Sequence, residues 1–336
     1  MKYKYIEAQW INALMRAFTN YGLNTRLITK DLVGFENGKM IIGARLEVSA
    51  ARRMWQRADQ LAQDPLLGLK IGCSQDYRSV GVLAPILWHS PSVRIALNHI
   101  ATFQTLISES GSFLLTETQD HEEPIIQCEY VPVPNSVPVN AHQVLAVIIG
   151  TVGIIQAISN NRVRAKRLYL PPNLNADLIS KGIECQIENR VGNLAICFTT
   201  EYFDQAILGC DEHLYQINLT YAEELLRSKR ASQALIDSIK KVIEQYGFST
   251  ATIEDAESHL ELHKRTLQRN LAQQGSSFRQ LKEEVLKEWA IKLLIRQKLE
   301  IDEVAQKLGY SEPSAFHRAF KTWFATTPKQ FSLGKV

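Results

Sequence analysis

The stretch that decides the fold lies near the C-terminus and reads IDEVAQKLGYSEPSAFHRAFKTWFATTP, residues 301–328. It predicts two short helices joined by a tight turn. Ala305 is small enough for the helices to approach each other, and Gly309 permits the turn. Ser311 stands where a residue would cap the second helix.

The second of these helices carries an arginine between two apolar positions. Phe316 and Phe320 are four residues apart and are expected to face a core. Arg318 lies between them and is expected to project toward whatever the helix docks on. This is the helix-turn-helix arrangement, whose second helix enters the major groove of DNA.

The same pattern occurs 49 residues upstream, where RTLQRNL at residues 265–271 matches SAFHRAF at residues 314–320. Leu267 and Leu271 take the apolar positions, and Arg269 takes the outward one. The sequence therefore predicts a second recognition helix of the same kind.

The turn before this upstream copy is less regular. Glu257 and Glu261 stand at the positions expected for the small residue and the glycine, and His263 stands where a capping serine is expected. The turn can still form, but its sequence signal is weaker.

From residue 234 onward the sequence predicts only helices. Gly247 marks the end of the first one, and Thr252 with Asp255 is typical of a capping box at the start of the next. A long helix over residues 278–297 joins the two copies. Its apolar stripe consists of Phe278, Leu281, Val285, Trp289 and Leu293.

Residues 236–331 resemble the DNA-binding domain of the arabinose-regulator (AraC/XylS) family of bacterial transcription regulators. The resemblance is carried by KRTLQRNLAQQGSSFRQL at residues 264–281 and by the opening stretch at residues 301–328. It implies an all-α double helix-turn-helix domain that binds double-stranded DNA. Both recognition helices would enter the major groove on one face, on adjacent turns about 34 Å apart, and a rigid joining helix would bend the DNA.

Eight side chains are the expected DNA contacts. Arginine side chains can bind guanine and glutamine side chains can bind adenine, so each of the two recognition helices offers side chains that could contact bases. Two lysines could contact DNA phosphates. The base readers are Arg265, Gln268 and Arg269, then Ser314, His317 and Arg318, and the phosphate contacts are Lys264 and Lys321. The alternative for each is a solvated position on an exposed helix.

The N-terminal part predicts an α+β domain. Residues up to about 110 are expected to be mostly helical, with helices from Ser49 and over residues 92–107, and with an irregular, glycine-punctuated segment at residues 66–87. Alternating apolar and polar residues then predict strands on both sides of a long helix at residues 140–160. The expected strands are residues 112–119, 124–131, 166–170, 184–189 and 194–200.

This part also resembles a known module, the arabinose-binding-type sensing domain of one branch of these regulators. The resemblance covers about residues 11–208 and is carried by LLGLKIG, GVLAPILWHSPSVRIALNHI, LYLPP and GNLAICFTTEYFDQAI. It implies a sensing or dimerisation domain at residues 1–208, a linker at 209–233 and the DNA-binding domain at 234–336. Trp88 and His89 are weak candidates for lining its ligand pocket.

The distribution of charge and the absence of known motifs limit the classes of function that the sequence allows. The net charge is +3, and residues 263–336 hold 14 Lys and Arg against 7 Asp and Glu, so the positive excess lies where phosphate would bind. Five cysteines without a CxxC pair favour reduced thiols in the cytoplasm, and Cys73 is expected to be buried. No catalytic, metal or cofactor motif is found, and neither a signal peptide nor a membrane span is expected.

The leading hypothesis is a cytoplasmic transcription regulator controlled by a small-molecule effector. One alternative is a ligand-independent regulator whose N-terminal domain only dimerises or binds a protein partner, and another is an enzyme with a DNA-binding appendage. A homodimer and a contact with RNA polymerase are further expectations.

Overall fold

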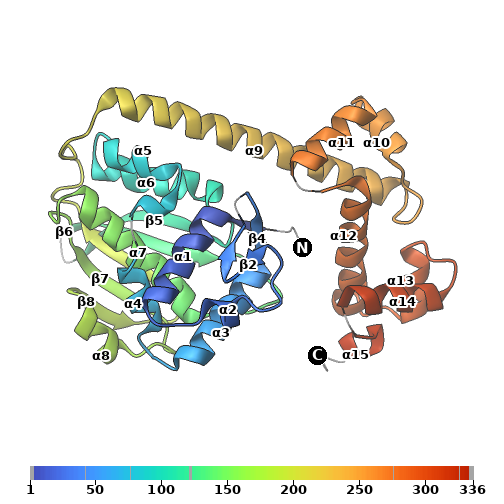
Figure 1. The fold of residues 1–336 in the computed structure, drawn as a ribbon, viewed down its shortest axis with the longest axis horizontal. Coiled ribbons are helices and arrows are strands. Elements are labelled where there is room, and N and C mark those ends of the chain that lie inside the picture. The colour runs from blue at the N-terminus through green and yellow to red at the C-terminus, as the bar shows by residue number, and fades with distance from the viewer. Residues whose placement is uncertain are drawn as a thin grey trace. The chain divides into compact units, whose positions relative to one another are not determined.

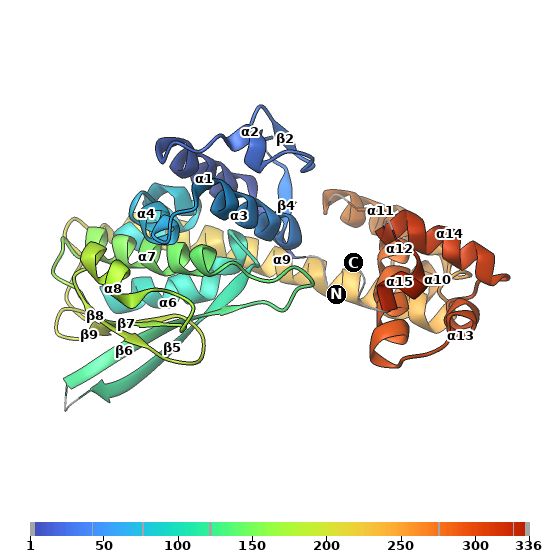
Figure 2. The same cartoon turned by 90° about the horizontal axis from the view of Figure 1, so that it is seen from below.

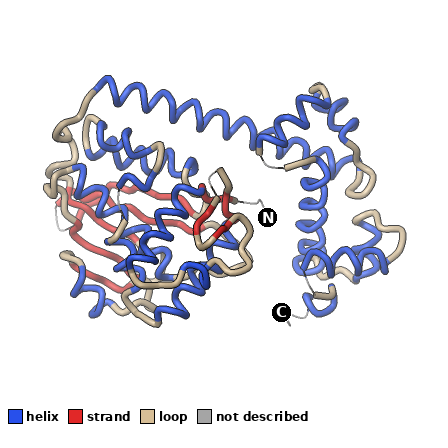
Figure 3. The backbone as a smooth tube through the Cα atoms, viewed as in Figure 1, coloured by secondary structure: helices blue, strands red, loops and turns tan. Residues whose placement is uncertain are grey.

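The computed structural model describes residues 4–332, apart from residues 42, 76, 121–122, 275 and 325. The chain divides into two compact units, residues 1–226 and 227–336, each with its own core (Figure 1). The predicted α+β fold followed by an all-helical region is confirmed, and strands occur only in the first unit among the described residues (Figure 3).

A five-stranded sheet forms the base of the first unit. Its strand order is β5-β6-β9-β7-β8, and all neighbours are antiparallel except β7 and β8. The five strands lie where the alternating pattern predicts them. They are β5 (Gly111–Asp120), β6 (Glu123–Pro132), β7 (Ala165–Leu170), β8 (Gln186–Asn189) and β9 (Ala195–Thr199).

Helix α7 (Ala141–Ile158) is the central helix of this unit. By length and composition it could cross a membrane, but 67% of the helix is buried inside the unit. A helix that is apolar all round is expected in a protein core as well as in a bilayer. Figure 2 shows α7 between the sheet and the outer helices α1 (Ala8–Asn20) and α3 (Val48–Ala62).

The glycine-punctuated segment at residues 66–87 is mostly helical where it is described, so the expectation of an irregular segment is wrong. It forms α4 (Leu67–Cys73), a 3₁₀ turn η1 (Tyr77–Val80) and α5 (Leu83–His89). The glycines have a packing role instead: a Cβ on Gly68 would lie 2.6 Å from the His142 carbonyl oxygen, and one on Gly72 would lie 2.6 Å from Ile149 Cβ. Glycine therefore lets α4 approach α7.

Two other expectations for this unit need correction. The mostly helical N-terminal region contains two small antiparallel pairs, β1 (Tyr5–Glu7) with β4 (Arg45–Glu47) and β2 (Phe35–Glu36) with β3 (Lys39–Met40). Cys73, the last residue of α4, is exposed rather than buried.

The predicted linker at residues 209–233 is largely helical. Helix α9 (Glu212–Tyr246) runs through it and ends before Gly247, whose φ of 101° fits the predicted stop. Its first half contributes Tyr215 and Ala222 to the core of the first unit. Its second half contributes Ile239 and Val242 to a core of the second unit.

The second unit consists of helices on both sides of α12 (Phe278–Ile291), which continues into a π-helical turn, η4 (Lys292–Arg296). The predicted joining helix and its apolar stripe are confirmed. Leu281 and Val285 belong to the first core cluster of the unit, Leu293 belongs to the second, and Trp289 packs against both.

Candidate DNA interface and ligand cavity

The second helix-turn-helix consists of α13 (Ile301–Lys307) and α14 (Pro313–Phe324). Ala305 is 1% exposed, which fits its predicted place between the helices. Gly309 adopts a φ of 81°, and a Cβ there would lie 2.2 Å from Ser249 Oγ. The backbone conformation therefore favours glycine, and a larger residue would also displace the Ser249 side chain.

The start of α14 differs from the prediction. The helix begins at Pro313, so the residue that precedes it is Glu312 and not Ser311. Pro313 suits the first helical position because its missing N–H has no helical acceptor there. The prediction that Ser311 caps this helix is therefore wrong.

The first helix-turn-helix consists of α10 (Ile253–Leu260) and α11 (Lys264–Gln273), and the predicted capping box of Thr252 and Asp255 is present. The small residue that lets these two helices approach is Ala256, which is fully buried. The prediction that Glu257 takes this position is therefore wrong. Glu257 Oε1 instead accepts a hydrogen bond from the Lys264 backbone N–H, 3.0 Å away. This carboxylate satisfies one free N–H at the start of α11.

The remaining two irregular residues complete the turn. Glu261 adopts the left-handed conformation, with a φ of 51°, at the position that Gly309 takes in the second copy. His263 Nδ1 accepts a hydrogen bond from the Arg265 backbone N–H, 3.2 Å away. The histidine thus acts as the cap in place of the expected serine.

Both recognition helices present an exposed arginine, as predicted. Leu267, Leu271, Phe316 and Phe320 are each at most 1% exposed, whereas Arg269 and Arg318 are exposed. Neither guanidinium has a hydrogen bond or ion pair within the described part of the chain. Both groups are thus free to bind an external acceptor.

The other expected contacts differ in availability. Arg265, Gln268, Ser314 and Lys321 are exposed, and His317 is half-buried. Lys264 forms an ion pair with Glu254, so a DNA phosphate would have to compete with that carboxylate.

The loop between α9 and α10 is held against α12 and packs against both halves of the unit. Lys282 Nζ donates hydrogen bonds to the carbonyl oxygens of Ser249, at 2.7 Å, and Ala251, at 2.8 Å. Phe248 packs against both core clusters of the unit. In Figure 2, α11 and α14 lie toward the upper side of this unit, and α10 and α13 lie toward its lower side.

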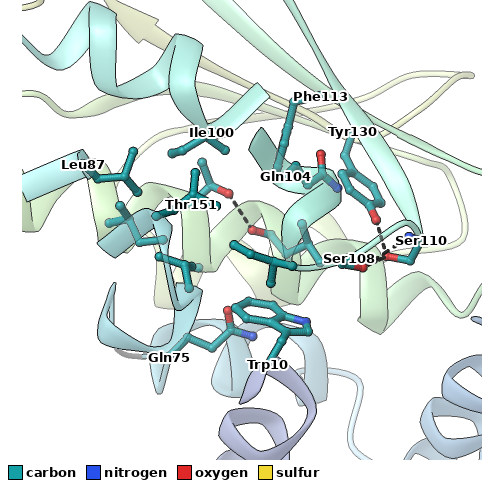
Figure 4. Close-up of a pocket in the computed structure, with 16 residues that line it drawn as sticks. Trp10, Gln75, Leu87, Ile100, Gln104, Ser108, Ser110, Phe113, Tyr130 and Thr151 are labelled. Carbon is teal, nitrogen blue, oxygen red and sulfur yellow. Dashed lines mark hydrogen bonds between the residues drawn. The ribbon is translucent and has the colours of Figure 1, made fainter. Parts of the chain in front are cut away.

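A separate site lies inside the first unit, between α1, α7, β5 and the α5–α6 region, where α6 is Val93–Phe103 and η2 is Gln104–Leu106 (Figure 4). The cavity has a volume of about 60 Å³, several times the roughly 10–15 Å³ that one water molecule needs. Most of its lining is apolar: Trp10, Val80, Leu83, Leu87, Ile100, Ile107, Phe113, Val147 and Ile154.

The polar groups of the cavity gather mainly on one side, where Figure 4 shows Ser108, Ser110 and Tyr130 together with Gln104 beside them. Ser110 Oγ lies 2.7 Å from Ser108 Oγ and 2.8 Å from Tyr130 Oη. Burial raises the pKa of Tyr130 to about 12, so its hydroxyl is neutral. Gln104 Nε2 donates to the Gly111 carbonyl oxygen, 3.0 Å away.

The predicted ligand candidates lie elsewhere. Neither Trp88 nor His89 is among the described residues that line the cavity. His89 Nδ1 accepts a hydrogen bond from the Asp211 backbone N–H, 3.2 Å away, close to the start of α9. Gln104 lines the cavity but was not among the predicted ligand contacts, and Gly150 lines it beside Gln75.

Two family models match the chain: a helix-turn-helix domain over residues 258–333, and the N-terminal arabinose-binding domain of AraC transcription regulators over residues 42–190. With the two helix-turn-helix copies described above, they define a transcription regulator with a DNA-binding domain and an arabinose-binding-type N-terminal domain. The chain belongs to the arabinose-regulator (AraC/XylS) family.

Several relatives are regulators of similar length. The ornithine utilization regulator of Pseudomonas aeruginosa is 20% identical over 334 residues, 97% of this chain and 96% of that protein. The regulator VqsM of the same organism is 22% identical over 276 residues, 79% and 82% of the two chains. The regulator VirS of Mycobacterium tuberculosis is 40% identical over 72 residues, 21% of each chain. The crystal structure of CdpR from Pseudomonas aeruginosa is 18% identical, with a TM-score of 0.48, and covers 95% of this chain and 97% of that one.

Proposed function

We propose that the chain binds specific DNA sites through α11 and α14, and that a small molecule in the cavity of the first unit controls this binding. One observation carries the proposal: the helix that lines the cavity is bonded to the helix that enters the DNA-binding unit. Ile100 of α6 lines the cavity, and the preceding residue, His99, lies with Nε2 2.8 Å from Tyr215 Oη of α9.

A ligand controls DNA binding only if its affinity differs between two states of the protein. A molecule that moves α6 or η2 would alter the His99–Tyr215 hydrogen bond and so act on α9. The C-terminal half of α9 contributes Ile239, Val242 and Ile243 to the core cluster that also contains Leu267 and Leu271 of α11. This connection gives the ligand a physical route to the recognition helix.

The test compares the full chain with Val147→Phe, whose larger side chain would fill the cavity, and with Val191→Phe, which adds the same group at a 91% exposed position. Native mass spectrometry of protein isolated from its host should show a retained small molecule that only Val147→Phe loses. Fluorescence anisotropy on a selected DNA site should show an affinity change when that molecule is removed. Equal retention by both variants, or unchanged DNA affinity, would favour the ligand-independent alternative.

The remaining expectations belong to this proposal. A regulator acts where DNA is, which favours the cytoplasm, and a homodimer would pair two binding units on one operator. A contact with RNA polymerase would link DNA binding to transcription. We propose that the chain acts as a regulator and not as an enzyme, because both family models that match it describe parts of regulators.

A further inference from the structure

The cavity of the first unit has an unsatisfied hydrogen-bond acceptor. Gln104 lines the cavity and is 8% exposed, and its Oε1 has no hydrogen-bond partner among the residues that the structure describes. The orientation of this amide is set by the Gly111 carbonyl oxygen, which can only accept, so the amide nitrogen must face it. A buried carbonyl without a donor is unfavourable, and a bound molecule that supplies a donor removes that penalty.

The described lining residues of the cavity include no charged side chain that could pair with a charged ligand. None of its described lining residues is Lys, Arg, His, Asp or Glu. Arg52 interacts electrostatically with Tyr130 but does not line the cavity, and its Nη1 and Nη2 donate to the carbonyl oxygens of Val137 and Val133. A carboxylate or ammonium in this site would lose its hydration without gaining a partner.

A free sugar is also a poor match, although the matching family model is described as arabinose-binding. A pentose carries a hydroxyl or ring oxygen on every carbon and needs polar partners around its whole surface. Here the polar side chains gather mainly beside Tyr130. Gln75 and Thr151 lie apart from them, Thr151 Oγ1 already donates to the Val147 carbonyl oxygen, and the other walls are built from residues such as Leu83, Leu87 and Ile154. Most of the sugar hydroxyls would therefore be buried without partners.

We propose that this cavity binds an uncharged, mainly apolar small molecule that carries a hydrogen-bond donor, and that Gln104 Oε1 accepts that donor. The proposal rests on the proposed function for its biological role, because it names the chemical class of the effector. The Ser108–Ser110–Tyr130 hydroxyls lie on the same side and can hold a second polar atom of the ligand.

The test uses indole as a neutral probe with one N–H donor, and 1-benzofuran as its isostere with oxygen in place of the N–H. Isothermal titration calorimetry on the full chain should show at least tenfold tighter binding of indole. Gln104→Met should reduce the affinity for indole to that for 1-benzofuran, and should leave 1-benzofuran binding unchanged. The unchanged 1-benzofuran affinity would show that the variant still folds and keeps its cavity.

Gln143→Met is the matched control. Gln143 is also buried, and within the described part of the chain its Oε1 has no partner, but it lines a smaller neighbouring cavity and not this one. Indole affinity should be unchanged in this variant. Loss of the indole preference in Gln143→Met alone, equal affinity of the two probes, no binding of indole up to its solubility limit, or binding of L-arabinose tighter than that of indole would each overturn the proposal.

The two proposals can fail separately. Gln104-dependent binding of indole supports the ligand class whatever the DNA affinity does. A change in DNA affinity on adding L-arabinose or a charged metabolite would instead keep the effector role and refute the ligand class.

Discussion

The residues next to Arg269 and Arg318 keep both guanidinium groups exposed and able to bind DNA. Each lies between two apolar side chains that anchor the helix in a core, Leu267 and Leu271 in one case and Phe316 and Phe320 in the other. The anchored backbone fixes the direction in which the arginine leaves the helix. A side chain presented in this way can read a base edge as well as attract phosphate.

Arg318→Ala should weaken binding to the specific site by about 1–3 kcal/mol and relax the preference at one base position. The expected cause is the loss of the two hydrogen bonds that we propose between this guanidinium and one guanine base. Fluorescence anisotropy with a set of single-base site variants measures both effects. Arg318→Lys is the control, because lysine keeps the positive charge but lacks the planar guanidinium that can make two parallel hydrogen bonds. This variant should lose the base preference and retain nonspecific affinity. An equal loss on every sequence would contradict base reading.

Lys321 and Lys264 should behave differently, although both were predicted phosphate contacts. Lys321 is exposed with no ion pair among the described residues, whereas Lys264 is paired with Glu254. Lys321→Ala should therefore reduce the slope of log affinity against log salt by about one unit, and Lys264→Ala should reduce it less. Binding titrations at several salt concentrations measure the slopes. Identical slopes for the two variants would show that the Glu254 pair does not compete.

Among the elements, the two helix-turn-helix turns reach one geometry with different residues. Gly309 adopts positive φ without strain, but Glu261 does so with a Cβ, which is unfavourable for an L-residue. The sequence alone therefore predicted the upstream turn less clearly than the downstream one. Its capping groups, Glu257 and His263, are recognisable only when the chain is folded.

Glu261→Gly should raise the free energy of unfolding by about 0.5 kcal/mol, since relief of left-handed strain outweighs the extra chain entropy of glycine. Gly309→Ala should lower it by about 1–3 kcal/mol, because the new Cβ adds strain and meets Ser249. Urea denaturation of the full chain compares the two. Destabilisation by Glu261→Gly would show that the glutamate makes an unrecognised compensating contact.

The contact of α4 with α7 allows a second comparison. Gly72→Ala would place a Cβ 2.6 Å from Ile149 Cβ and should destabilise the first unit by about 1–3 kcal/mol. Gly153→Ala on α7 meets nothing within 4 Å and should stabilise it by about 0.5–1 kcal/mol through helix propensity. Thermal unfolding followed by circular dichroism checks both signs. A neutral Gly72→Ala would contradict the close packing of these helices.

For the molecule as a whole, α9 belongs to the cores of both units, and its bond to α6 involves a titratable group. Burial lowers the pKa of His99 from its usual value of 6.5, although the charge of Glu223 opposes the shift. The unfolded chain therefore binds the proton more readily. The stabilisation from neutral His99 is fully present above about pH 6.5 and is lost as the pH falls toward the folded-state pKa.

His99→Gln should keep a hydrogen bond to Tyr215 Oη but remove this titration. The melting temperature of the wild-type chain should fall more steeply than that of the variant between pH 7 and pH 5. Calorimetry at matched pH values measures the difference between the two curves. Parallel curves would show that His99 does not titrate in this interval.

The amino-acid pattern alone was sufficient for features that depend on local spacing. The paired helix-turn-helix motifs, the outward Arg269 and Arg318 and the strands follow from apolar periodicity and from turn residues such as Gly309, and the core helix α7 follows from its long apolar run. Other features depend on residues far apart in the chain. The helical path of residues 66–87 requires α7 beside its glycines, and the cavity requires Trp10, Gln104 and Thr151 to converge from separate elements. Periodicity reports which face of an element is buried, but not which distant side chains it meets or where packing leaves a space.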